Sequence, residues 1–440
     1  MKRILFVALL LLAAALTWAG GQTEGAEPSY ELILVNTGTT PWDVVEHPYD
    51  TGGYPSFQHK IVGEFQQAHP NIRVNLIIRD VTQGSMTVDA LMAKGTPPDV
   101  WLDAAGYFRS YLNADYALPL EQYMDVSAYR EDLVAPYTRD GHVYALPMVN
   151  VATGLAVNLS MLKEIGYTLP PTEQWTTDEF LVLAERLKAA GYPAIMIMTK
   201  GGLISWDMAW LYAFGGELFK PGDYSKVTIN TPEARAGLEY MKLLVDRGYS
   251  WPYPNETDDD MGVDLFTTGK VFACVMQNGH SDYWIPEQVK QGALKEAFDY
   301  TFVEVPHAPG RAHTPVYSYQ TCVIAKRSAD EGRNKAVAAL LQTQAGAEYQ
   351  QYCVTMQGAF PTLKDFEIPD IGTAKKPSYK AIAKLAPVAG QMDLGGMHPR
   401  VKEVNAAWKI PIQEFMEGKI TAQQVLDRFE AEANKVLAAK

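Results

Sequence analysis

Carboxylates are the groups through which this 440-residue chain could most directly do chemistry. Hydrolysis of a sugar bond needs two carboxylates, placed on either side of that bond. Carboxylates are plentiful, but no motif marks two of them as a pair; examples are Asp99, Asp103, Asp207 and Asp282. Solvated surface is therefore the default expectation for each of these side chains, and a secreted glycosidase remains an alternative function.

Patterns typical of other catalysts are absent from the sequence. It contains no G-x-x-x-x-G-K-[ST], G-x-G-x-x-G, H-E-x-x-H, C-x-x-C or G-x-S-x-G motif. Of the eight His, the two closest, His307 and His313, enclose a turn sequence and do not have metal-ligand spacing. Asp258-Asp-Asp260 is interpreted as a solvated loop, with a calcium site as the minor alternative. We expect no catalytic residue, no metal site and no cofactor.

Ligand binding needs only aromatic rings and hydrogen-bonding groups, and the chain is rich in rings. It holds 9 Trp and 24 Tyr, which suits stacking on flat ligand faces. A net charge of −13 argues against nucleic acid as a partner. The odd set Cys274, Cys322 and Cys353 lies among apolar neighbours, so buried free thiols are expected. A disulfide between Cys322 and Cys353 is the less favoured alternative.

Residues 1–19 have the pattern of a secretory signal peptide. Lys2 and Arg3 precede an apolar stretch, and cleavage is expected after Ala19. The stretch is too short to span a bilayer. Because no cysteine lies near the cleavage point, no lipid anchor is expected there. These features predict a periplasmic protein that is soluble after cleavage.

The elements that would position a binding site alternate between strands and helices. Short apolar runs predict strands over 31–36 and 72–78, and apolar residues four apart predict a helix over 56–68. Thr176 or Thr177 is expected to cap one helix, and Thr231 to cap another. A strand is predicted over 320–325, and one long helix over 334–353. This alternation predicts an α/β fold with a parallel sheet between helices.

Several short motifs, in this order, resemble those of the bacterial extracellular solute-binding proteins (family 1, sugar-type), and together they cover nearly all of the chain after residue 19. The motifs are Gly95-Thr-Pro-Pro-Asp-Val100, Ala117-Leu-Pro-Leu-Glu-Gln-Tyr123, Asp140-Gly-His-Val-Tyr-Ala-Leu-Pro147, the stretch from Leu162 to Phe180, Phe266-Thr-Thr-Gly-Lys270 and Gly358-Ala-Phe-Pro361.

The resemblance implies a two-lobe periplasmic-binding-protein fold (type II), with three interlobe crossings and a ligand cleft between the lobes. The expected first lobe is 20–147 plus 306–357, and the expected second lobe is 148–305 plus 358–440. Pro147 is expected to end one strand at the first crossing, where a second strand begins at once. Residues 302–306 are expected to form the second crossing strand.

The resemblance also implies a function. The chain is expected to be the receptor of an ABC importer, to capture a mono- or oligosaccharide by hinge closure, and to deliver it to the membrane permease subunits. We expect it to work as a monomer, without nucleic acid. A receptor for a non-sugar solute, such as a polyamine, a metal or a phosphate ester, is the alternative within this class.

Candidate ligand contacts follow cleft-facing strands or lie in the crossings. Asn150 stands out because a polar side chain among apolar neighbours needs a partner. At His280 the sequence departs from the family pattern, which usually has an aromatic residue there. Core packing in a helix is the equal alternative for Trp408. The full set of expected contacts is Trp42, Asp43, Asp103, Tyr107, Asn150, Trp206, Asn278, Gly279, His280, Tyr317, Tyr319 and Trp408.

Overall fold

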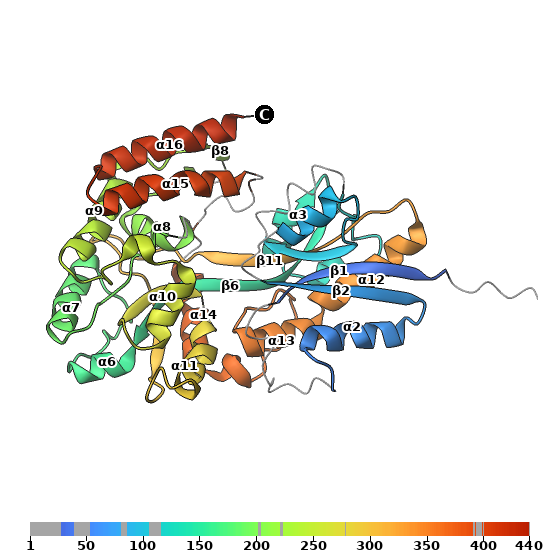
Figure 1. The fold of residues 1–440 in the computed structure, drawn as a ribbon, viewed down its shortest axis with the longest axis horizontal. Helices are drawn as coiled ribbons and strands as arrows, with labels where there is room; N and C mark the ends of the chain where they lie inside the picture. Colours follow the sequence, from blue (N-terminus) through green and yellow to red (C-terminus); the bar gives the residue numbers. More distant parts are fainter. Residues whose placement is uncertain are drawn as a thin grey trace, which may run out of the picture.

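One continuous sheet runs through two lobes (Figure 1). The computed structural model describes residues 28–38, 53–80, 86–104, 116–200, 204–220, 223–277, 279–389, 392, 398 and 400–439. Within these residues the strand order is β10-β6-β11-β3-β1-β2, with β9 also paired to β6. The strands are β1 (Tyr30–Gly38), β2 (Ile72–Asp80), β3 (Val100–Ala104), β6 (Ala145–Asn158), β9 (Ala273–Gln277), β10 (Tyr300–Val303) and β11 (Ser318–Ala325).

The sheet is mixed, whereas the sequence predicted a parallel one. Strand β1 pairs in parallel with β2 and β3, but β11 runs antiparallel to both β3 and β6. Strands β9 and β10 also run antiparallel to β6. The parallel part is thus confined to β1–β3, where helices connect successive strands, and the strands joining the lobes are antiparallel.

The first lobe is built on β1, β2 and β3. Side chains of β1 alternate between its two faces, as a strand requires: Leu32 and Leu34 enter one buried cluster and Val35 enters another. The first cluster lies under α2 (Phe57–Ala68), α12 (Glu331–Ala345) and α13 (Ala347–Gln357), and the second lies under α3 (Met86–Ala93). The lobe therefore has helices on both faces of its sheet.

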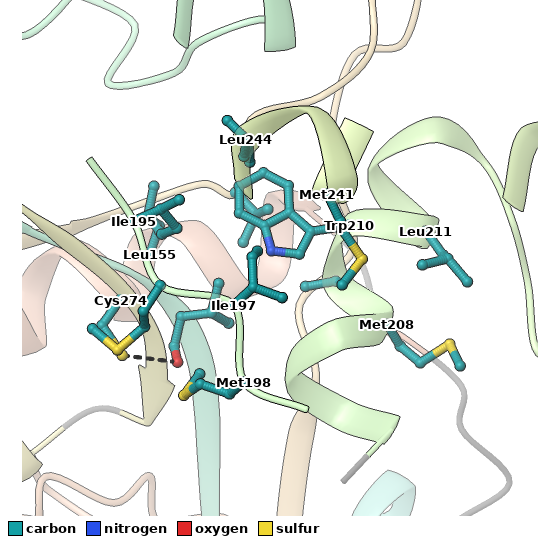
Figure 2. Packing of buried hydrophobic residues seen from close by; sticks show 14 of the residues in the cluster. Leu155, Ile195, Ile197, Met198, Met208, Trp210, Leu211, Met241, Leu244 and Cys274 are labelled. Atoms are coloured by element: carbon teal, nitrogen blue, oxygen red, sulfur yellow. Dashed lines mark hydrogen bonds between the residues drawn. The ribbon is translucent and has the colours of Figure 1, made fainter. Parts of the chain in front are cut away.

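The second lobe is built on β9, β10 and the second half of β6. Its core surrounds Trp210, which is 2% exposed and lies near Ile197, Met241 and Leu244 (Figure 2). Trp210 therefore packs in the core of this lobe. The helices of this lobe are α6 (Leu159–Glu164), α7 (Thr177–Ala189), α8 (Ile204–Phe214), α9 (Pro232–Asp246), α10 (Asp259–Thr267), α11 (His280–Lys290), α14 (Pro377–Ala389), α15 (Val401–Met416) and α16 (Ala422–Ala438).

Short elements complete the described fold. They are α5 (Glu131–Val134), the pair β4 (Thr138–Arg139) and β5 (His142–Val143), and the pair β7 (Phe219–Lys220) and β8 (Asp223–Val227). No helix in the described ranges is both long enough and apolar enough to cross a bilayer. Cys274, Cys322 and Cys353 are buried and none forms a disulfide, as expected. Residues 1–19, the expected signal peptide, lie outside the described residues.

Helix starts confirm the caps that the sequence predicted. Thr176 caps α7 in a capping box with Glu179, and Thr231 accepts a hydrogen bond from the Ala234 N–H. The long helix expected over 334–353 is instead two helices, α12 and α13. They are separated at Gly346, whose backbone is extended (φ −72°, ψ 174°), so the hydrogen-bond ladder is broken there.

The prediction that Pro147 ends a strand is wrong, because β6 continues through it. The pairing of β6 with β11 shifts at this point: Cys322 faces Pro147, whereas Thr321 faces Val149. A bulge tolerates a residue without an N–H donor, so the strand can accept proline here. The Pro147 carbonyl accepts a hydrogen bond from Thr362 Oγ1 at 2.7 Å. The sheet itself therefore passes from one lobe to the other.

Along the crossing segments, successive residues pass from the buried cluster of one lobe to that of the other. On β6, Val151 belongs to the core of the first lobe and Ala152 to the core of the second. Val316 lies in the second core and Val323 in the first, and β10 pairs only with the second-lobe half of β6. We therefore propose that the chain changes lobe at 151–152, within 317–322, and after Ala359.

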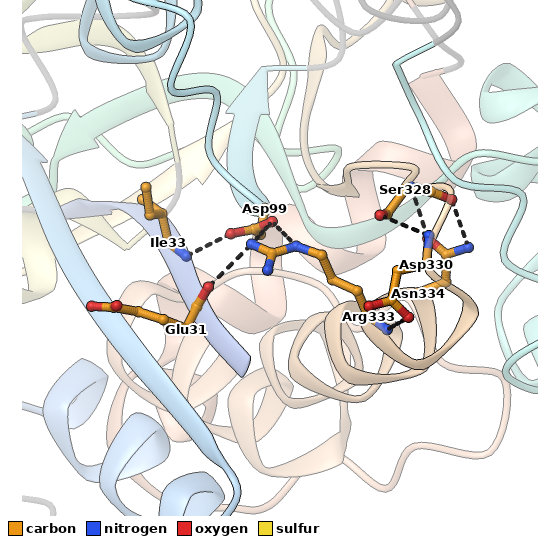
Figure 3. Close-up of polar contacts among 7 residues, drawn as sticks. All are labelled: Glu31, Ile33, Asp99, Ser328, Asp330, Arg333 and Asn334. Carbon is orange, nitrogen blue, oxygen red and sulfur yellow. Dashed lines mark hydrogen bonds and ion pairs between the residues drawn. The ribbon is translucent and has the colours of Figure 1, made fainter. Parts of the chain in front are cut away.

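Asp99 and Arg333 hold α12 against the first strands of the sheet (Figure 3). Arg333 Nε and Nη2 donate to Asp99 Oδ1 at 3.1 and 2.7 Å, and the Ile33 N–H donates to Asp99 Oδ2 at 2.9 Å. Arg333 Nη2 also donates to the Glu31 carbonyl at 3.1 Å. Asp99 is only 3% exposed, so the solvated-surface expectation is wrong for this carboxylate.

We expect Arg333→Ala to destabilise the first lobe, because it leaves the buried Asp99 carboxylate without its cation. The loss in free energy of unfolding should be about 2–4 kcal/mol, toward the lower part of the range for broken buried pairs, since the arginine side chain is 30% exposed. Arg130→Ala is the matched control, because its partner Asp132 is 62% exposed, and it should cost less than about 1 kcal/mol. Denaturant titration decides; equal losses in the two variants would contradict the assignment.

Candidate functional site

Three chain segments lie side by side between the lobes. The backbone N–H and Oγ1 of Thr153 donate to the Tyr317 carbonyl at 2.8 and 3.1 Å, which joins β6 to the start of β11. On the other edge of β6, the Phe360 N–H donates to the Asn150 carbonyl at 2.6 Å. This three-stranded strip joins the two lobes through backbone hydrogen bonds.

Asn150 occupies the middle of this strip. Its side-chain Oδ1 is buried and has no hydrogen-bond partner among the described residues. A buried acceptor without a donor costs about 1–3 kcal/mol. A ligand hydroxyl or N–H that reached this atom would supply the missing donor. Asn150 is therefore the expected contact that the structure supports most directly.

Tyr317 and Gly279 also lie beside the strip. Tyr317 is half-buried and packs against the core of the second lobe. Gly279 is buried in the turn between β9 and α11, with φ +89°. Because a glycine offers only its backbone, the structure gives Gly279 a role in the turn and in chain packing.

Two expected contacts are buried inside single lobes. Asp103 is 1% exposed, with Oδ1 3.7 Å from Arg79 Nη2, so its charge is balanced by a neighbour on β2. This overturns the solvated-surface expectation for Asp103. Trp408 is fully buried, with its ring 5.0 Å from the Phe429 ring in an edge-on arrangement. The structure thus supports the core-packing alternative for Trp408.

The remaining expected contacts stay predictions. Trp42, Asp43, Tyr107 and Asn278 lie outside the described residues. Trp206, His280 and Tyr319 are placed in α8, α11 and β11 by their backbones, and their side chains lie outside the described part.

The acidic run Asp258–Asp260 is ordered at the start of α10, which corrects the solvated-loop interpretation. Asp258 caps the helix by accepting from the Met261 N–H, and its carboxylate pairs with Lys200 Nζ at 2.7 Å. The described residues contain no group of three or more His, Cys, Asp or Glu arranged to hold a metal ion, so the calcium alternative gains no support. An Asp directly before a helical apolar pattern was the overlooked cap signal.

Asp259, the middle residue of this run, has an ionisation behaviour that the sequence analysis did not address. Burial raises its pKa to about 7, and the neighbouring carboxylates of Asp260 and Asp258 add to the effect. The nearest usable signal was the run of three acids itself, since like charges in one turn oppose each other's ionisation.

Asp259→Asn should raise the melting temperature near pH 8 and change it little near pH 4. The ordinary pKa of the group is 3.8, so between 3.8 and about 7 the folded chain holds a proton that the unfolded chain releases. This group's contribution to stability therefore falls as pH rises through that window, and an amide abolishes the loss. Calorimetric melts from pH 4 to 8 measure it, with the 84%-exposed Asp140→Asn as control. A pH-independent difference would contradict the assignment.

A family model and a curated relative both match the chain. The family model described as "Bacterial extracellular solute-binding protein" matches residues 47–351. An uncharacterised ABC transporter extracellular-binding protein of Pyrococcus horikoshii is 23% identical over 283 residues. That match covers 60% of this chain and 60% of the relative, which is less than two thirds of the relative's length.

Solved structures resemble the chain over almost its whole length. A chitin oligosaccharide binding protein has a TM-score of 0.76 at 20% identity, covering 93% of this chain and all of its own. Maltose-bound MalE3 of T. maritima has a TM-score of 0.73 at 17% identity, and the match covers 92% of this chain and 98% of that chain. UgpB of Mycobacterium tuberculosis in complex with glycerophosphocholine has a TM-score of 0.70 at 18% identity, and the match covers 94% of this chain and 99% of that chain. These likenesses confirm the two-lobe α/β fold that the sequence predicted.

Proposed function

The chain belongs to the bacterial extracellular solute-binding protein family, and from this premise we propose that it is the receptor of an ABC importer that captures a mono- or oligosaccharide between its lobes. The observation that carries the proposal is the buried, unpartnered Asn150 Oδ1 in the strip that joins the lobes. A sugar hydroxyl is a donor of the right kind to satisfy it.

Two considerations favour a sugar over other solutes. The structural relatives include a protein named for chitin oligosaccharide and one bound to maltose. Another relative holds glycerophosphocholine, which keeps a phosphate-ester ligand as the second candidate. The net charge of −13 opposes the approach of an anionic phosphate monoester but not that of a neutral sugar, and it does not distinguish a sugar from zwitterionic glycerophosphocholine.

The proposed mechanism is a change in population and breaks no bond. The two cores are joined by backbone pairs at β6, β11 and Phe360, so the lobes can rotate while these pairs persist. A ligand that touches both lobes lowers the free energy of the closed state only. Delivery to a permease, export to the periplasm with cleavage after Ala19, and action as a monomer belong to the same proposal.

We expect a thermal-shift screen to identify the ligand class. A ligand present at 100 times its Kd stabilises the folded state by about 2.7 kcal/mol, which raises the melting temperature. Chitin oligosaccharides, maltodextrins and monosaccharides are tested beside glycerophosphocholine and spermidine. A shift with a sugar supports the proposal, and a shift with glycerophosphocholine alone would replace it. Chromatography of the sugars after incubation should show no shorter products; their release would favour a glycosidase.

Asn150→Ala should weaken binding of the sugar found in that screen. Loss of the acceptor leaves a ligand hydroxyl unpaired, at about 1–3 kcal/mol, or roughly fivefold to more than a hundredfold in Kd. Asn230→Ala is the matched control, since that amide bonds to Asp427 on the surface of the second lobe. Trp408→Ala should lower the melting temperature more than the affinity. Titration calorimetry decides, and wild-type affinity in a folded Asn150→Ala protein would remove this residue from the site.

A further inference from the structure

Two glycines bring the backbones of the two lobes into direct contact. Gly279 ends the turn after β9 with φ +89°, and Gly358 ends α13 with φ +67°. A Cβ added to Gly279 would lie 1.8 Å from the Gln357 carbonyl oxygen. A Cβ added to Gly358 would lie 2.8 Å from Thr373 Cγ2 and 3.0 Å from Gly279 Cα. No side chain separates Gly279 from the backbone of Gln357 and Gly358, so this contact cannot be relieved by a change of rotamer.

Gly279 moves with the second lobe. It precedes α11, and α11 is fastened to α14 where Ser378 Oγ donates to the two oxygens of Asp282 at 3.4 and 3.3 Å. Helix α14 in turn contributes Ile382 and Ala389 to the buried core of the second lobe. The turn at Gly279 therefore has no independent freedom from that lobe.

Gly358 is attached to the first lobe through α13. The Tyr352 ring of α13 stacks on the Phe57 ring of α2, with centroids 4.0 Å apart and planes 3° from parallel. Tyr349 adds an edge-on contact to the same Phe57 ring. The glycine pair thus joins two bodies that are each packed tightly on their own side.

The contact lies on one side of the crossing strands. Helices α11 and α13 lie on the same side of β6 and β11, and α3 and α15 lie on the other (Figure 1). One turn after Gly279, Tyr283 packs from α11 against the core of the first lobe, which widens the contact on the α11–α13 side. The lobes therefore meet off-centre with respect to the strip that joins them.

We propose that the Gly279–Gly358 contact, with Tyr283 beside it, is the fulcrum that sets the resting angle between the lobes. Packed atoms do not interpenetrate, so material added on the α11–α13 side turns the lobes toward each other on the α3–α15 side. Removing side-chain atoms on the α11–α13 side lets the lobes turn apart on the α3–α15 side. Apparent affinity scales with the fraction of closed protein, so the same contact tunes ligand binding. That last step alone rests on the proposed function.

The test measures the lobe angle directly, without ligand. Spin labels are attached at Met86→Cys on α3 and Ile410→Cys on α15, which are 66% and 61% exposed, whereas the native cysteines are buried. Pulsed electron paramagnetic resonance then gives the distance between the labels. Gly279→Ala should shorten the mean distance, because its methyl group acts as a wedge, and Tyr283→Ala should lengthen it.

Gly269→Ala is the matched control for backbone strain. Gly269 also has a positive φ (+69°) and lies shortly before β9, but a Cβ there would make only ordinary contacts, with Leu294 Cδ1 at 3.6 Å and the Phe298 ring at 3.8 Å. This variant carries the strain of the left-handed conformation without a wedge, so its label distance should equal that of the wild type. Circular dichroism establishes that each variant is folded.

Unchanged label distances in folded Gly279→Ala and Tyr283→Ala would overturn the fulcrum, and so would shifts in the same direction. If Gly279→Ala does not fold, Tyr283→Ala decides alone. With ligand, Kd should fall in Gly279→Ala and rise in Tyr283→Ala. Wild-type protein that binds no sugar, yet shows the opposite distance shifts in the two variants, would leave the fulcrum standing and defeat only the proposed function.

Discussion

The backbone of β6 is the constraint on which the two-lobe arrangement depends. Its buried N–H and C=O groups must be paired along the whole strand. On one edge it pairs first with β11 and then with β10; on the other it pairs with Phe360 and then with β9. Each lobe thus completes the hydrogen bonding of the same strand. The lobes therefore cannot separate without exposing unpaired backbone, and bending about β6 is the motion that the proposed function uses.

Buried charges are compensated within the first lobe. Asp99 and Asp103 are balanced there by Arg333 and Arg79. Breaking such a pair leaves a desolvated charge, which resists internal rearrangement of a lobe. At the strip between the lobes, by contrast, a buried polar atom lacks a partner: Asn150 Oδ1 has no described donor. Rigid bodies with an unsatisfied group at their junction are suited to closing on a ligand.

Local signals in the sequence predicted what local interactions determine. The β1 strand, the helix after Ser56 and the caps at Thr176 and Thr231 all follow from neighbouring residues. The failures need partners that are distant in sequence: a bulge opposite β11 lets β6 continue through Pro147, and antiparallel β11 makes the sheet mixed. The candidate site divides in the same way. Asn150 could be chosen from its apolar neighbours, but the burial of Trp408 against Phe429 depends on tertiary packing.

Fold alone does not select the ligand, since structures of this shape carry names as different as chitin oligosaccharide, maltose and glycerophosphocholine. Two separable properties then decide affinity. One is the set of groups that touch the ligand, of which Asn150 is the best supported here. The other is the free energy of closure without ligand, which we propose depends on interlobe contacts such as that of Gly279 with Gly358. A substitution at Asn150 should then act on ligand contact and one at Tyr283 on closing tendency, since Tyr283 lies outside the set of expected ligand contacts.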